Sequence, residues 1–206
     1  MISCCGLSSG MADAAPSIEQ LGEKVADSGA LPEGGRLQLK LMGRYITVLR
    51  LQGKVLCIDA VCFHAGGPLG IGDIEEVNGR ACLVCPWHYY KIDIESGDKY
   101  YQKMSFQNGK MVEGDWVSNG VKQRTHKVTE QDGAIYVRLS TAPAVVESDE
   151  YARMASCGDR VMSSAARQRG PNVGGDGRLP SGSVLRSARE AAQASNPGSA
   201  WRSAGR

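Results

Sequence analysis

The stretch CFHAGGPLGIGDIEEVNGRACLVCPWHYYKIDIESGDKYY, residues 62–101, decides the fold of this chain. It contains two short motifs, C-x-H at Cys62 and His64 and C-x-x-H at Cys85 and His88, with 20 residues between them. Each motif couples a thiol to an imidazole, and two cysteines with two histidines complete the ligand set of one small metal centre. The glycines that follow the first motif allow the backbone to approach such a centre closely. The stretch therefore predicts a metal site made of these four residues.

Two kinds of centre suit this set of donors. Zinc also takes two cysteines and two histidines in a tetrahedral site, but zinc fingers usually keep the cysteine pair and the histidine pair separate. Here each motif is mixed, which favours two metals with different ligands. We therefore expect an iron–sulfur centre and keep structural zinc as the alternative.

The same stretch resembles the ligand region of small soluble Rieske proteins. The later stretch GVKQRTHKVTEQDGAIYVRLS, residues 120–140, also resembles theirs, and the likeness extends over about residues 35–150. The resemblance implies an all-β Rieske fold, in which an antiparallel, β-sandwich-like basal domain carries a small inserted cluster-binding subdomain. It also implies a [2Fe–2S] cluster, with Cys62 and Cys85 on one iron and His64 and His88 on the other.

Composition along the chain predicts three parts. Residues 1–34 are expected to be a flexible segment with one short helix over residues 17–25, for which Ser17 is the N-cap. The middle part, residues 35–150, is the one that the resemblance implies to be a Rieske domain, with its cluster-binding part at about residues 60–100. Residues 151–206 are basic and rich in Gly, Ser, Ala and Arg, and a disordered tail is expected there.

Short β-rich runs separated by turn signals predict the strands of the domain. Residues 103–119, in contrast, show little periodicity and give no clear prediction. The predicted strands lie at residues 37–41, 45–51, 55–60, 80–84, 89–94, 122–129 and 134–139.

Charge is distributed unevenly. Residues 1–150 hold 15 basic and 19 acidic side chains, whereas residues 151–206 hold 9 basic and 3 acidic ones, so a net charge of +2 combines an acidic body with a basic tail. The tail arginines lack interleaved aromatic residues apart from Trp201, so nucleic acid is not an expected partner. No run of 18 apolar residues exists, and no membrane span is expected.

Cysteine usage indicates the compartment. Besides the two predicted ligands, five cysteines are placed irregularly, which argues against a secreted disulfide framework. The N-terminus also lacks the basic region of a secretory signal. We expect a reducing, cytoplasmic location, with Cys57 and Cys82 as small buried side chains.

The resemblance carries information on the reduction potential. In high-potential Rieske proteins a Ser two residues after the last ligand and a Tyr four residues after it donate hydrogen bonds to the cluster, and a disulfide joins the two loops. Here Tyr90 and Ile92 occupy the first two places, and Gly67 and Trp87 occupy the disulfide positions. The chain thus departs from the high-potential pattern and resembles the Rieske ferredoxins.

These observations favour a soluble electron carrier that works between a flavin-type reductase and an acceptor oxidoreductase, through the His64/His88 end of the cluster. No catalytic residue is assigned. A Rieske oxygenase also needs a mononuclear iron held by two histidines and a carboxylate, and only His126, expected to be structural, remains for it. A small Rieske subunit of a larger oxidoreductase and a zinc-stabilised interaction module stay open as alternatives.

Overall fold

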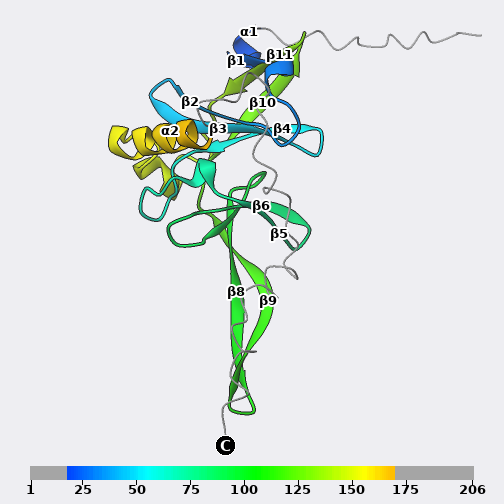
Figure 1. The fold of residues 1–206 in the computed structure, drawn as a ribbon, viewed down its shortest axis with the longest axis vertical. Coiled ribbons are helices and arrows are strands. Elements are labelled where there is room, and N and C mark those ends of the chain that lie inside the picture. The colour runs from blue at the N-terminus through cyan, green and yellow to red at the C-terminus, as the bar shows by residue number, and fades with distance from the viewer. Residues whose placement is uncertain (1–17, 170–206) are drawn as a thin grey trace, which may run out of the picture.

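The computed structural model describes residues 18–169, which form two antiparallel sheets and two α-helices (Figure 1). The six-stranded sheet has the order β1-β11-β10-β4-β3-β2, with bounds Glu23–Asp27, Ala134–Arg138, Thr125–Gln131, Lys54–Asp59, Arg44–Leu51 and Arg36–Leu41. The five-stranded sheet has the order β5-β6-β7-β8-β9, with bounds Ile74–Val77, Arg80–Val84, Lys91–Asp93, Asp98–Gln107 and Lys110–Val121. The helices are α1 (Ile18–Leu21) and α2 (Ala155–Arg169), and 3-10 turns span Ser28–Ala30, Leu69–Ile71 and Glu147–Glu150. The predicted all-β class is confirmed.

Strand β3 is buried on both faces and so connects the parts of the core. Ile46 and Val48 face a cluster that includes Cys57 of β4 and the apolar residues of β11. On the opposite face, Leu49 joins the cluster beneath the predicted ligand loops, and Tyr45 packs beneath α2. Because side chains alternate along a strand, one strand thus supports both the basal sheet and the loops.

The predicted cluster-binding part is a separate small sheet layered on this base. The apolar side chains of β5, β6 and β7 pack with Leu49 and Ile58 of the basal sheet. The loop between β4 and β5 contains the first motif, and the loop between β6 and β7 contains the second. Both motifs therefore lie at one end of the small sheet, on loops whose bases are held in the core.

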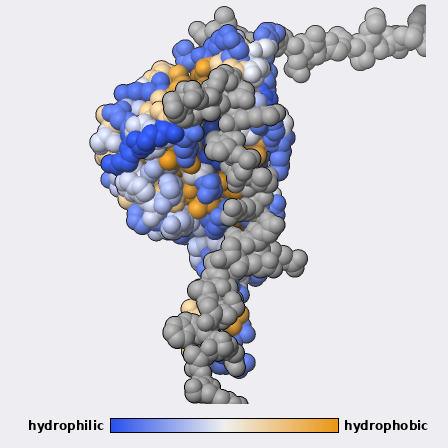
Figure 2. Space-filling model, in the orientation of Figure 1, coloured by the Kyte–Doolittle hydropathy of each residue, from blue (hydrophilic) through white to orange (hydrophobic). Residues whose placement is uncertain are grey.

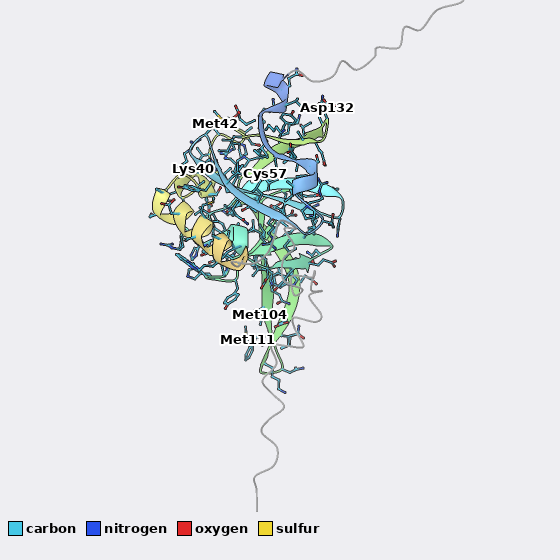
Figure 3. The ribbon with its side chains drawn as sticks, turned by 45° about the horizontal axis from the view of Figure 1, so that its top comes forward. Lys40, Met42, Cys57, Met104, Met111 and Asp132 are labelled. Atoms are coloured by element: carbon cyan, nitrogen blue, oxygen red, sulfur yellow. The ribbon has the colours of Figure 1, made fainter. Side chains whose placement is uncertain are left out.

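The hairpin of β8 and β9 projects from the body (Figure 1). Met104 and Met111 lie on it (Figure 3), and Phe106 next to them is 71% exposed. Figure 2 shows hydrophobic residues at the surface of this hairpin. Both of its faces meet solvent near the tip, and this explains the lack of alternation over residues 103–119.

The prediction for the N-terminal segment is wrong in part. The helix ends at Leu21, and Glu23–Asp27 form strand β1, which pairs with β11. The folded unit therefore begins before residue 35. Pairing with the free edge of β11 outweighs the local helix signal, because each strand residue gains cross-strand contacts that an isolated short helix lacks. The proposed cap, Ser17, lies outside the described residues.

The prediction of a disordered segment from residue 151 is wrong for residues 151–169, which include helix α2. Cys157, Val161 and Ala165 are buried at a spacing of four, so they form one face of the helix. This face packs on Tyr45, whose hydroxyl donates to the Asp159 carboxylate at 2.9 Å. Small side chains suffice because Gly158 lies directly against the Tyr45 ring. Residues 170–206 lie outside the described part. Neither helix within residues 18–169 has the length and apolarity needed to span a membrane.

Truncation after Glu150 is expected to destabilise the domain by about 3–6 kcal/mol, because the buried face of α2 is lost and Tyr45 is exposed. Truncation after Arg169 keeps every described contact and is the matched control. Thermal unfolding followed by circular dichroism measures the difference between the two proteins. Equal melting temperatures would show that α2 contributes nothing to the stability of the domain.

Candidate metal centre

The first ligand loop is a tight turn fixed by backbone hydrogen bonds. The Cys62 N–H donates to the Gly67 carbonyl at 2.8 Å, and the Gly66 N–H donates to the Cys62 carbonyl at 3.1 Å. Gly66 has a φ of +69°, a left-handed conformation that glycine adopts without steric cost. The turn buries Cys62 and leaves His64 exposed to solvent.

The second ligand loop closes in the same manner. The Cys85 N–H donates to the Tyr90 carbonyl at 2.9 Å, and the Tyr89 N–H donates to the Cys85 carbonyl at 2.8 Å. Tyr89 has a φ of +57° and so lies outside the strand predicted to begin there. As in the first loop, the cysteine is buried while His88 is exposed.

All four predicted residues come together, as two pairs. The Nδ1 atoms of His64 and His88 are 3.3 Å apart, and the Cys62 thiol donates a hydrogen bond to the Cys85 sulfur. Within residues 18–169, no three side chains of the metal-binding types gather around a single ion position. The arrangement is thus a buried thiol pair beneath an exposed imidazole pair.

Hydrogen bonding favours the thiolate form of one of the two sulfurs, that of Cys85. The bond from Cys62 is the main reason that the pKa of Cys85 falls to about 6, although burial opposes this, and the backbone N–H groups of Trp87 and His88 lower it further. The pKa of Cys62 is raised because its thiol donates to Cys85 and because burial disfavours the thiolate. Cys85 is therefore the thiol that more readily presents a negative sulfur to a metal.

The space around the sulfurs is shaped for a compact inorganic group. A Cβ atom on Gly67 would lie 3.0 Å from the Cys85 sulfur and 3.2 Å from the Trp87 ring. Gly67 and Trp87 are thus neighbours, and no disulfide can join them because glycine has no side chain. Two soft sulfurs on the inside and two imidazole nitrogens on the outside fit the asymmetric ligand set of a two-iron cluster.

Aromatic rings surround the imidazole pair. The Tyr90 ring is stacked on Phe63 with centroids 5.7 Å apart, and its centroid is 4.7 Å from that of His64. Trp87 is 6.5 Å from His88 and remains partly exposed. Ile92 is fully buried in the core. The rings limit access of water to the flanks of the site and leave the histidine edges open.

Sequence reasoning missed Gln123, which holds the first loop from below. Its side chain is fully buried, and its amide nitrogen donates to the carbonyls of Val61 at 2.7 Å and Asp59 at 3.0 Å. Its amide oxygen accepts the N–H of Phe63 at 3.0 Å. One planar amide therefore fixes the residues on both sides of Cys62. Nothing local marks this glutamine, because its partners lie some 60 residues earlier in the chain.

Asp59 is the centre of a buried polar network beneath the same loop. Its carboxylate accepts hydrogen bonds from Arg44 at 2.5 Å, from Ser148 at 2.6 Å and from His126 at 3.1 Å. His126 is thus a satisfied structural residue, as expected. Cys57 and Cys82 are buried, also as expected. The signal for the network was an acidic residue inside an apolar run, since a buried charge needs partners.

A buried cysteine pair and an exposed histidine pair, carried on two loops at one end of a small antiparallel sheet, define a Rieske-type site. The chain matches the family described as soluble Rieske-type ferredoxin over residues 25–142. It is also 41% identical over 117 residues to a Rieske domain-containing protein of Homo sapiens, covering 57% of this chain and 74% of that protein. The chain belongs to the soluble Rieske-type ferredoxin family, whose members bind a [2Fe–2S] cluster.

Two further similarities are more limited. A cholesterol 7-desaturase of Ciona intestinalis is 35% identical over 71 residues, which span 34% of this chain and 14% of that protein. A ferredoxin of carbazole 1,9a-dioxygenase from Nocardioides aromaticivorans is 19% identical, with a TM-score of 0.41, over 57% of this chain and 97% of that chain.

Replacing Gln123 by Leu is expected to shorten the lifetime of the bound cluster by about tenfold or more. The change leaves the Phe63 N–H and two carbonyls without partners in the core, and each buried unsatisfied group costs about 1–3 kcal/mol. Bleaching of the visible absorbance at a fixed temperature measures cluster release. Gln107→Leu removes an exposed amide from the hairpin tip and is the control. An unchanged bleaching rate in Gln123→Leu would contradict the positioning role.

Proposed function

We propose that this chain carries one electron at a time on a [2Fe–2S] cluster held by Cys62, His64, Cys85 and His88, between a flavin-type reductase and an acceptor oxidoreductase. The observation that carries the proposal is the division of these residues into a buried thiol pair and an exposed imidazole pair, in a chain of the Rieske-type ferredoxin family. The cluster, when bound, supplies a one-electron redox couple.

The positions of the four residues determine the side of the domain through which the electron enters and leaves. The thiols lie in the core, so electron transfer through that side would have to cross the whole domain. The imidazoles reach the surface, so a partner can bring its own cofactor close to His64 and His88. Rigid loops also favour fast transfer, since the hydrogen bonds that fix Cys62 and Cys85 leave little to rearrange when the charge changes.

Access by water is limited on the remaining sides. Phe63 and Tyr90 stack beside His64, and Trp87 lies beside His88. Lys99 lies over the Tyr90 ring, with its ammonium 4.7 Å from the centroid. These groups keep the interior of the site apolar while the histidine edges stay accessible, as suits an electron carrier with no bound substrate.

Single replacement of Cys62 or Cys85 by Ser is expected to abolish the cluster, because each removes a ligand on which binding and loop structure both depend. His64→Ala and His88→Ala are expected to do the same. The measurements are iron and sulfide content, visible absorbance and the electron paramagnetic resonance spectrum of the reduced protein. Cys82→Ala removes a buried thiol outside both loops and should keep a full cluster. A normal spectrum in any of the four ligand variants would refute the assignment of that residue.

The reduction potential is expected to lie near or below 0 mV, within the range of about −150 to +300 mV that Rieske centres cover. Ile92 is buried and offers no hydroxyl, Gly67 and Trp87 form no disulfide, and the Tyr90 ring is stacked on Phe63 with Lys99 over it. Fewer donors to the sulfides leave more negative charge on them and make reduction harder. Protein-film voltammetry at neutral pH measures the midpoint. A value near +300 mV would contradict both this tuning and a role downstream of a flavin reductase.

A further inference from the structure

Two cations rest on the aromatic rings that surround the exposed histidines. The Lys99 ammonium lies 4.7 Å from the centroid of Tyr90, and the Arg160 guanidinium lies 4.8 Å from that of Trp87. Tyr90 in turn contacts His64, and Trp87 is the neighbour of His88. Each cation is therefore separated from a histidine by a single aromatic ring. We call this set of two cations and their two rings the cationic rim.

Among the residues that the structure describes, no ion pair neutralises either charge of the rim. Neither Lys99 nor Arg160 forms a salt bridge within residues 18–169, whereas nearby Lys91 is paired with Glu75. A cation–π contact holds the side chain in place and leaves its full positive charge, unlike a salt bridge. Both cations are thus fixed in position and available to an approaching anion.

The acidic residues next to the two cations in sequence, Asp98 and Asp159, accept hydroxyl hydrogen bonds and form no ion pair with Lys99 or Arg160 within residues 18–169. Asp159, next to Arg160 in the sequence, accepts the hydroxyl of Tyr45. Glu150 lies beside Tyr151, whose pKa its negative charge raises. Residues 18–169 hold 19 basic and 19 acidic side chains, so the folded unit has no net charge and the two cations make the rim a local positive region.

We propose that the cationic rim docks an acidic surface of the partner oxidoreductase, and so places the partner's cofactor against His64 and His88. The inference rests on the proposed electron-transfer function and adds the charge of the partner to it. Arg160 belongs to α2, which lies beyond the family match at residues 25–142. Half of the charge for docking thus comes from a segment that the family pattern does not include.

Small inorganic oxidants test the local charge at the histidine edge without a known partner. The reduced holoprotein is mixed in a stopped-flow instrument with ferricyanide, a trianion, or with tris(phenanthroline)cobalt(III), a trication, at an ionic strength of about 10 mM. The variants are Lys99→Glu, Arg160→Glu and their combination. Lys110→Glu, at the tip of the projecting hairpin, changes the net charge equally at a distant place.

The double variant is expected to react with ferricyanide about tenfold more slowly than the unchanged protein and with the cobalt complex correspondingly faster. Lys110→Glu should change either rate by less than about twofold, and salt at about 0.2 M should reduce all differences. Equal rates in the double variant and the unchanged protein, or an equal effect of Lys110→Glu, would overturn the proposal. Lack of a [2Fe–2S] spectrum in the unchanged protein would instead refute the proposed function.

A protein acceptor distinguishes an acidic protein surface from other anions. Transfer to an acidic plastocyanin is expected to slow about tenfold in the double variant, and transfer to a basic c-type cytochrome is expected to quicken. Sedimentation with phosphatidylserine vesicles that depends on Lys99 and Arg160, with no effect on transfer to plastocyanin, would assign the rim to a membrane surface and overturn the proposal. Absorbance and circular dichroism confirm that each variant keeps its cluster and fold.

Discussion

The carboxylate of Asp59 is the point at which the basal sheet, the ligand loop and the C-terminal part of the domain meet. It is fully buried and accepts hydrogen bonds from Arg44 of β3, His126 of β10 and Ser148 of a 3-10 turn. Its backbone carbonyl accepts a hydrogen bond from the Gln123 amide, which also donates to the Val61 carbonyl beside Cys62. A buried carboxylate is stable only when paired, and removing one partner of such a pair costs about 3–5 kcal/mol. Breaking this buried network costs much free energy, so the first ligand loop that it supports is held rigidly.

Helix α2 supports the ligand loops from their outer side. Its Cys157 lies against Gly66, so that a methyl group on that glycine would be 2.6 Å from the thiol sulfur. One turn further, Arg160 covers the Trp87 ring. The two ligand loops, which come from different parts of the small sheet, are therefore contacted by a single rigid element. Below them the amide of Gln123 holds one loop, and beside them α2 touches both.

The parts of this structure that could be read from the sequence are those with a local signal. The two mixed motifs predicted the four residues that the fold brings together, and alternating or β-rich runs predicted most strands of the basal sheet. Strands β8 and β9 were not predicted, because both of their faces are exposed near the tip and their sequence lacks the apolar/polar alternation on which the prediction depends. Helix α2 was hidden by its small side chains, although the spacing of Cys157, Val161 and Ala165 is a helical signal. Gln123 could not be found, since only the fold brings it to Cys62.

The sequence separations within the Asp59 network bear on how the domain folds. The predicted ligands occupy 27 consecutive residues, Cys62 to His88, but the supports of the first loop are remote. Asp59 and His126 are 67 residues apart, Asp59 and Ser148 are 89 apart, and Arg44 and Asp149, which also pair, are 105 apart. Contacts between residues so far apart in sequence form slowly, because the entropy of closing a long loop is lost before the contact contributes any favourable free energy. A nascent chain that has emerged only as far as His88 holds every predicted ligand and strands β1 to β6, but it lacks Gln123, His126 and Ser148. The four predicted ligands therefore reach their final arrangement late, together with the whole domain.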